Sequence, residues 1–507
     1  MKSTKMACVA VMTAFAVLTI PTWINAQEQA REQDVKHHHY QLIDVGTFGG
    51  PASAFNSGRM LNKRGVAVGA SETSVPDQLS SNGWPCGPGA FVYHAFDFQN
   101  DHVIDLGSLP GTDRFCSNAN SINAQGEIVG NSEIRKIDSV LGLHEIRAVR
   151  WNGNLIKNLG TLGGKHSAAN DINDRDQIVG FALNEIPDPW SMFYLAFGNP
   201  NGTQTRAFLW QRGTMQDLGT LGGPDAMASF INRQGQVTGI SFTNSIPNDT
   251  TGFPTQDPFL WEKGQIIDIG SLGGTFGQPS ALNNRGQVAG NSNLAGDETQ
   301  HAFLWDRGTL TDLGTLGGTF SFANWLDDEG EVVGAATTPG DSLLHATLWR
   351  KGKITDLGTL PDDCFSLANW INAKDQVVGQ SFSCNGTIAR EVLWDKGVTI
   401  DLGARILPGS KLAAINPMAI NERGEIVGKG VPPGCDSEDQ CGHAFVLLPV
   451  DDDIEATTGA IRSDPAANPK SPAMPAQHRL MTQEFVAQLR ARLAQQNHLP
   501  NAGAGRR

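Results

Sequence analysis

Six cysteines carry the most definite chemistry in this sequence: Cys86, Cys116, Cys364, Cys384, Cys435 and Cys441. None of them lies in the Cys-x-x-Cys spacing that is typical of structural zinc sites. The seventh cysteine, Cys8, lies in the segment 1–26 that is expected to be removed on export. The even number that remains in an exported chain favours disulfide bonds. The positions of these residues within the repeats described below predict the pairs Cys86–Cys116, Cys364–Cys384 and Cys435–Cys441.

Aromatic side chains form the second group of candidates. They gather in two otherwise polar stretches, one around Trp84 and one between residues 185 and 206. Exposed aromatic rings stack on sugars or anchor protein partners. Trp84, Trp190, Phe193 and Tyr194 are therefore candidate ligand-binding residues. The alternative is that these side chains fold down onto the protein as a lid.

The evidence for a metal site or a catalytic site is weaker. The histidines at 37–39 could bind a metal, but they lie in a polar lead and are expected to be solvated. Asp436, Glu438 and Asp439 could hold Ca²⁺, yet the D-x-D-x-D-G pattern of a calcium loop is missing. The sequence also lacks the G-x-S-x-G, H-E-x-x-H and P-loop motifs. We therefore expect no catalytic residue, no metal and no cofactor.

Three recurring elements must position these residues. The first resembles DLGTLGG and occurs eight times, at residues 44, 105, 158, 217, 268, 312, 356 and 401. The second is an Ile/Leu-Asn pair, a turn and a Val-Gly ending, at 61–69, 122–130, 172–180, 231–239, 282–290, 326–334, 371–379 and 420–428. The third is an apolar pentad such as HAFLW, at 94–98, 147–151, 206–210, 257–261, 301–305, 345–349, 390–394 and 443–447.

The fixed spacing inside these elements predicts two β-hairpins in each repeat, because hairpin loop length fixes strand register. Each repeat then has four short strands, and repeats begin 44 to 61 residues apart, as in propeller blades whose loops have grown. The predicted fold is all-β, a β-propeller of eight four-stranded blades. The strand at Tyr40 is a fourth strand that precedes the first complete repeat, and the last repeat ends with its pentad, 443–447. Pairing of these two strands would close the eighth blade.

Packing between blades explains the pentad. Phe303 and Trp305 are expected to fill one gap between blades, while Ala302 and Leu304 face the other. The six pentad tryptophans are therefore core residues. The loops that vary in length follow the Val-Gly ending and the DLG element. Alternate connections of an up-and-down blade emerge on the same side, so these loops share one face, which is the candidate functional surface.

The termini read as separate segments. Residues 1–26 resemble a secretory signal peptide, with Lys2 and Lys5 before a short apolar run. Residues 27–39 are a flexible lead, 40–449 the propeller, 450–481 a Pro/Ala-rich linker, 482–497 a short amphipathic helix and 498–507 a tail. We expect a secreted or periplasmic protein. A net charge of −14 argues against nucleic acid as a partner, and no apolar stretch suits integral membrane association.

The HAFLW, DLGTLGG and IN..GQVVG elements together resemble the HAF-repeat family of bacterial extracellular proteins, over about residues 40–449. The resemblance implies an exported repeat protein with a propeller fold, and it carries no activity to particular residues. The preferred hypothesis is a non-enzymatic binding scaffold for glycan or protein ligands on the variable loop face. The alternative is a polysaccharide-active hydrolase or lyase whose site lies at the propeller mouth, formed by histidines and carboxylates from different blades.

Overall fold

The computed structural model describes residues 38–450, except 57, 78, 80–90, 110, 154, 200 and 410–411. The chain separates into two units, Met1–His38 and His39–Arg507, and the fold described below belongs to the second. The predicted signal peptide, the linker, the C-terminal helix and the tail lie outside the described residues.

The fold is all-β, and each repeat contributes four strands. The first strands of the repeats are β2 (Gly49–Phe55), β6 (Ser117–Ile122), β10 (Ser167–Ile172), β14 (Ala226–Ile231), β18 (Gly273–Leu282), β22 (Ser321–Leu326), β26 (Asp363–Ile371) and β30 (Ala413–Ile420). The second strands are β3 (Ala67–Pro76), β7 (Ile128–Ile137), β11 (Ile178–Asp188), β15 (Val237–Pro247), β19 (Val288–Leu294), β23 (Val332–Thr337), β27 (Val377–Ser383) and β31 (Ile426–Val431).

The third strands contain the pentads. They are β4 (Phe91–Gln99), β8 (His144–Asn152), β12 (Gly202–Gln211), β16 (Pro254–Glu262), β20 (Gln300–Asp306), β24 (Leu344–Arg350), β28 (Ala389–Asp395) and β32 (His443–Val450). The fourth strands are β1 (His39–Asp44), β5 (His102–Gly107), β9 (Leu155–Asn158), β13 (Thr214–Asp217), β17 (Gln265–Asp268), β21 (Thr309–Asp312), β25 (Lys353–Asp356) and β29 (Val398–Asp401). Short helical turns are α2 (Met192–Leu195), α3 (Glu438–Cys441), η1 (Pro339–Asp341) and η2 (Gly403–Arg405).

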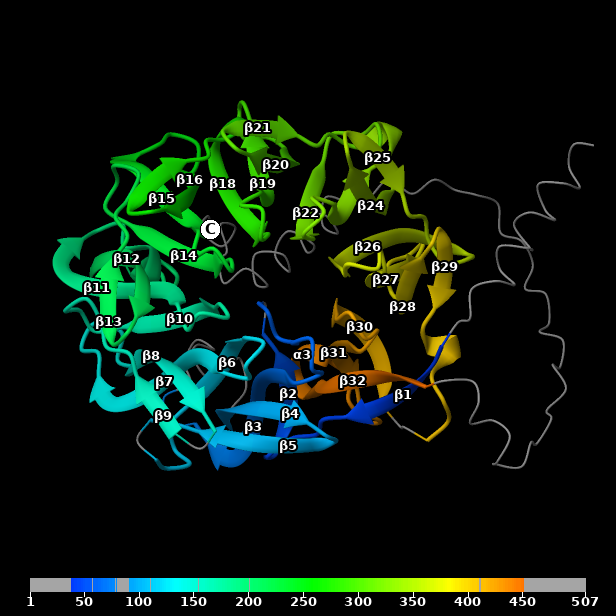
Figure 1. Cartoon of the computed structure of the whole chain (residues 1–507), viewed down its shortest axis with the longest axis horizontal. Helices are drawn as coiled ribbons and strands as arrows, with labels where there is room; N and C mark the ends of the chain where they lie inside the picture. The colour runs from blue at the N-terminus through cyan, green and yellow to red at the C-terminus, as the bar shows by residue number, and fades with distance from the viewer. Residues whose placement is uncertain are drawn as a thin grey trace, which may run out of the picture. The chain divides into compact units, whose positions relative to one another are not determined.

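The strands of a repeat pair in chain order to form four-stranded antiparallel sheets, and two of these sheets are joined by one parallel contact between β16 and β18. Figure 1 shows the sheets following one another around a common centre, with the first strands nearest to it. The sheet of β30, β31 and β32 takes its fourth strand from the other end of the chain. There β1 pairs with β32, with Leu42 opposite Leu447.

The hairpin between the third and fourth strands has a two-residue turn. In β20–β21 the pair Asp306↔Thr309 encloses Arg307 and Gly308, whose φ angles are 47° and 87°. Positive φ at both positions defines a type I′ turn, whose twist matches that of the strands. The predicted register of this hairpin is confirmed.

The Asn of each Ile/Leu-Asn pair links neighbouring sheets. Its Oδ1 accepts N–H groups from the turn that follows, and its Nδ2 donates to the main-chain oxygen of the equivalent residue in the next repeat. We call these bonds the asparagine ladder, and its donors are Asn62, Asn123, Asn173, Asn232, Asn283, Asn372 and Asn421. The last of them joins Asn421 Nδ2 to the oxygen of Asn62, at 3.1 Å. A motif that looked like turn chemistry therefore also holds sheets together.

The core lies between sheets, as the pentad pattern predicted. Phe303 and Trp305 pack with Leu260 of the preceding repeat, whereas Ala302 packs with Ala323 and Leu326 of the following one. All six pentad tryptophans are buried. The glycine of the Val-Gly ending is required by a close approach: a Cβ on Gly334 would lie 1.9 Å from the main-chain oxygen of Phe322.

Two predicted disulfides, Cys364–Cys384 and Cys435–Cys441, are present. Cys116 is also disulfide-bonded, while Cys86 lies outside the described residues. The Cys364–Cys384 bond joins the start of the first strand β26 to the loop that follows the second strand β27, so these two segments lie at the same end of their sheet. Within the described part of the chain, no helix has both the length and the apolar character needed to cross a bilayer.

Candidate functional site

The candidate binding surface is built on the long loops that follow β7, β11 and β15. Each of these second strands continues beyond a register shift, between Glu133 and Ile137, Leu183 and Pro187, and Phe242 and Pro247. Such bulges re-aim the strand and its side chains. The extensions and their loops carry large apolar side chains that are exposed, and we call this set the apolar platform: Ile137, Val140, Ile186, Ile246 and Phe253.

The loop between β11 and β12 covers part of its own repeat. Its helix α2 buries Phe193 and Tyr194, which are only 3% and 1% exposed. They pack with Ile146, Phe181 and Leu183. These two candidate residues therefore do not present a free surface to a ligand; they hold the loop against the strands, which is the alternative that the sequence left open.

A buried charge cluster fixes this loop to the neighbouring repeat. The Tyr194 hydroxyl donates to Oδ2 of Asp138 at 2.6 Å, and Nε2 of His166 lies 2.9 Å from the same oxygen. Lys165 pairs with the other oxygen. Burial alone would raise the pKa of Asp138, but the hydrogen bonds from His166, Lys165 and Tyr194 outweigh it and hold that pKa well below its usual range. Burial lowers the pKa of His166, so the neutral ring donates to Asp138 and accepts from the Ile146 amide.

A second carboxylate anchors the start of the same loop. Asp225 is fully buried and accepts N–H groups from Met192 and Thr205. Burial, together with the nearby carboxylate of Asp188, raises its pKa well above the usual value. The loop is therefore held at both ends by polar contacts that exclude water, and a fixed loop is a better platform than a loose one.

Trp190 is the predicted aromatic candidate that reaches the surface. It is partly buried, packs on Met192, and meets the edge of Phe253 with ring centroids 6.1 Å apart. This contact joins the loops of two neighbouring repeats. Trp84 lies outside the described residues, so its part in ligand binding stays a prediction.

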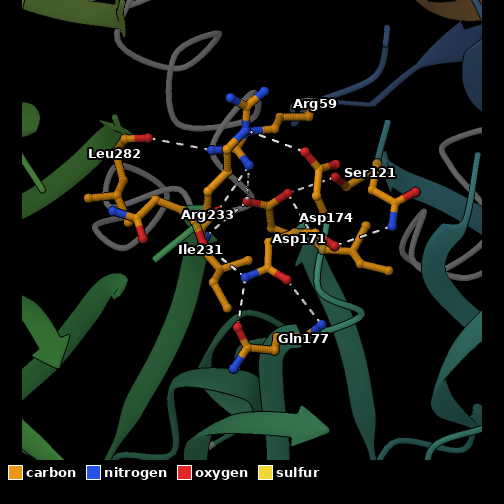
Figure 2. A network of polar contacts seen from close by, with 12 residues as sticks. Arg59, Ser121, Asp171, Asp174, Gln177, Ile231, Arg233 and Leu282 are labelled. Carbon is orange, nitrogen blue, oxygen red and sulfur yellow. Dashed lines mark hydrogen bonds and ion pairs between the residues drawn. The ribbon is translucent and has the colours of Figure 1, made fainter. Parts of the chain in front are cut away.

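The centre of the array holds a different polar network, shown in Figure 2. Arg59, from the segment between β2 and β3, donates to the main-chain oxygens of Ile231 and Leu282 at 2.9 and 3.4 Å. Its guanidinium also lies 3.5 Å from Oδ2 of Asp171, which is almost fully buried. Ser121 and the Ile231 amide donate to the same carboxylate. One side chain of the first repeat thus ties together strands from three other repeats.

In other repeats, aromatic rings occupy the position that corresponds to Asp171. Trp325 and Trp370 stack with centroids 3.4 Å apart, and Phe230 meets Trp325 edge-on at 6.1 Å. In every repeat this position lies two residues before the Asn, or its counterpart Asp327, of the ladder. Sequence analysis missed both groups; the available signal was that this position varies between Met, Ser, Asp, Phe, Ala and Trp while its neighbours repeat.

The repeated histidines have a structural role. Nδ1 of the first pentad residue pairs with the Asp of the DLG element at 2.8 to 3.0 Å, and the pairs are His94–Asp105, His301–Asp312, His345–Asp356 and His443–Asp44. The same Asp residues accept the amide of the glycine two residues later. The Asp of the DLG element therefore caps the turn that follows it, which is a structural role.

The enzyme hypothesis predicts that histidines and carboxylates from different repeats converge at the propeller mouth. The described contacts of Arg59 are with one carboxylate and main-chain oxygens. Burial raises the pKa of Glu133 and of Glu391 to about 7 and that of Asp97 to about 6, but these acids belong to separate sheets.

No protein-family model and no curated protein sequence matches this chain. Among solved structures it is similar to propeller-type proteins, all at low identity. They include the acylaminoacyl peptidase of Pyrococcus horikoshii (TM-score 0.37, 12% identity, 78% of this chain and 58% of that one) and TolB of Acinetobacter baumannii (0.31, 11%, 65% and 81%). A gluconolactonase of Xanthomonas campestris, XC5397, gives 0.28, 9%, 66% and 86%. The chain thus spans little more than half of the peptidase, and these likenesses carry no argument about activity.

Proposed function

We propose that this protein is an exported, eight-bladed β-propeller of the HAF-repeat type that acts as a non-enzymatic binding scaffold for protein or glycan ligands. Closure of the ring is supported by the pairing of β1 with β32 and by the bond from Asn421 to Asn62. Export is supported by the disulfides, which persist in oxidising compartments. The ligand-binding region is the apolar platform together with Trp190 and Trp84.

The observation that carries this proposal is the concentration of exposed large apolar side chains on neighbouring loops. Apolar surface that is exposed contiguously on a soluble domain marks interaction sites. Here the loops touch: Trp190 contacts Phe253, and Asn199 donates to the main-chain oxygen of Val140. The buried carboxylates Asp138 and Asp225 hold the middle loop in place, so little ordering entropy is lost on binding.

The chemistry of the platform favours a protein surface over a sugar. Ile186 and Ile246 offer branched aliphatic groups, which pack into apolar pockets, whereas sugars stack on flat aromatic faces. Trp190 and Phe253 add aromatic edges. The acidic character of the chain, with a net charge of −14, favours neutral or basic partners.

The test begins with a screen of the wild-type protein on a glycan array and on an array of cell-surface proteins. We expect the variant that combines Ile186→Asp and Ile246→Asp, and separately Trp190→Ala, to lose at least about tenfold in affinity for the ligands found, since buried apolar anchors dominate interface energies. The matched control is Leu155→Asp, because Leu155 is equally apolar and 77% exposed but begins a fourth strand at a tight turn.

The proposal fails if the Ile186/Ile246, Trp190→Ala and Trp84→Ala variants all keep full binding to every ligand found. It also fails if Leu155→Asp weakens binding as much as the platform variants do. Circular dichroism of each variant checks that the sheets are intact.

A further inference from the structure

The asparagine ladder has one interruption, at Asp327. At this position the other repeats carry Asn. The Nδ2 of each donates to the next repeat, and in all of them except Asn62 it also donates to the side chain four residues later. Asn283, for example, donates to the main-chain oxygen of Asp327 at 2.9 Å and to Oε1 of Gln287 at 2.7 Å. A carboxylate has no proton to give in its ionised form.

Asp327 nevertheless occupies the same place as the asparagines. Its Oδ1 accepts the amides of Glu329 and Glu331, at 2.9 and 2.8 Å, as the asparagine oxygens do in their own turns. Its Oδ2 therefore replaces the donor nitrogen of the ladder. That oxygen is buried and has no hydrogen-bond partner, and the residue is only 6% exposed.

Two more acids lie close to the Asp327 carboxylate. The residue four positions later is Glu331, which is also buried, and the next repeat supplies Asp375 at a turn position where most repeats have glycine. One carboxylate oxygen from each of Asp327, Glu331 and Asp375 lies within 4.8 Å of the others. Arg350 pairs with Glu331 and Asp375, so one positive charge faces three negative ones.

The chain contains its own comparison for this cluster. Around Asn123 the same three neighbours occur: Glu127, Asp176 and an arginine, Arg150, that bridges them. There the ladder residue is neutral and donates to Glu127 Oε2 at 2.8 Å and to the Asn173 oxygen at 3.2 Å. The two clusters thus differ chiefly by one amide in place of one carboxylate, which is the change that creates an unpartnered buried oxygen.

We propose that Asp327, Glu331 and Asp375 bind a divalent cation, with Ca²⁺ the best fit, at the place where the other repeats have the ladder amide. Carboxylate and main-chain oxygens are the ligands that Ca²⁺ prefers. By analogy with the other links, the main-chain oxygen of Asn372 faces the site. The exposed carboxylate of Asp375 gives the ion a path from solvent. The ion bridges two neighbouring repeats and restores the missing link of the ladder.

The experiment measures cation binding by calorimetry and thermal unfolding of the full chain after removal of metals with EDTA. For the wild type we expect heat on titration with CaCl₂ and a midpoint temperature that rises with Ca²⁺, since a ligand that binds the folded state stabilises it. Asp327→Asn should lose the response, and its metal-free form should unfold at or above the temperature of the metal-free wild type. Asp375→Gly, which restores the common turn residue, should weaken binding at least about tenfold.

Asn123→Asp is the matched gain-of-function variant, because it turns the sister cluster into a copy of the proposed site. It should unfold at a lower temperature without metal and gain a second Ca²⁺ response. The proposal is overturned if the wild type shows neither heat of binding nor a shift in midpoint temperature with Ca²⁺ or Mg²⁺ up to about 10 mM. This concentration is well above the dissociation constants of extracellular calcium modules. It is equally overturned if Asp327→Asn keeps the response, or if the wild type is stabilised by acid alone and by neither cation.

Discussion

Closure of the array by β1 can be tested with one side chain, Leu42. It lies on β1 opposite Leu447, is 8% exposed, and packs in a cluster with Leu393 and Ile400 of the neighbouring sheet. Leu42→Ala removes three buried carbon atoms and leaves a cavity, while the backbone pairing of β1 with β32 is untouched. Substitutions of this kind cost about 2–5 kcal/mol, and we expect about 3 kcal/mol here because the residue is nearly but not fully buried.

The assay is equilibrium unfolding in guanidinium chloride, followed by the fluorescence of the buried pentad tryptophans. A loss of stability appears as a lower midpoint with an unchanged slope. Leu155→Ala serves as the control, because substitution of an exposed side chain that takes no part in core packing or in a buried hydrogen bond changes the free energy of unfolding by less than about 0.5 kcal/mol.

A double-mutant cycle with Leu447→Ala makes the result specific to the contact. Leu447 belongs to β32, so its own substitution is expected to be costly whether or not β1 is paired. If β1 closes the last sheet, the two substitutions are coupled by about 0.5–3 kcal/mol, as residues in contact are. A cost for Leu42→Ala no larger than that of Leu155→Ala, together with additive effects in the cycle, would refute closure by β1.

Three further predictions concern the anchors of the fold. Tyr194→Phe removes one of the two hydrogen bonds that reach Oδ2 of Asp138 and leaves that of His166, so it should destabilise by about 1–3 kcal/mol and speed proteolysis between residues 185 and 206, while far-UV circular dichroism stays unchanged. Burial raises the pKa of Glu391 to about 7 in the folded state. The stability that the protonated Glu391 contributes is therefore present at low pH and is lost as the pH rises toward 7. Glu391→Gln should flatten the measured pH dependence of stability and raise stability most at pH above 7. Replacing Cys364 and Cys384 by Ser, in a loop of 20 residues, should cost about 2–4 kcal/mol in denaturant unfolding under non-reducing conditions, and dithiothreitol should then have little further effect at this loop.

The sequence predicted the strands well because the interactions that fix them are local and repeat. The turn at Arg307 and Gly308 closes a hairpin whose register depends on two residues, and the alternation in the pentad places Phe303 and Ala302 on opposite faces. Every repeat offers the same evidence again, so one ambiguous copy is corrected by the others.

Contacts between distant repeats could not be predicted in this way. Arg59 contacts Leu282, which lies 223 positions away in the chain, and no pattern near Arg59 in the sequence predicts that contact. The aromatic loop shows the same limit: whether Tyr194 faces solvent depends on Asp138, a residue of another repeat. A buried hydroxyl needs a partner, and the partner here lies 56 residues away.

Departures from the repeat are where chemistry specific to one place can arise, because the other copies define what that place normally does. Asp171 occupies a position that in other repeats is apolar, aromatic or small, and it is the acid that receives Arg59. Asp327 replaces the amide of the ladder and is left with a buried oxygen that has no hydrogen-bond partner. If this carboxylate had no role, Asn at position 327 would be the more stable residue, because its amide would donate to Glu331 as Asn123 donates to Glu127. That the carboxylate stands there instead, beside two others, is the physical reason to look for a positive ion between them.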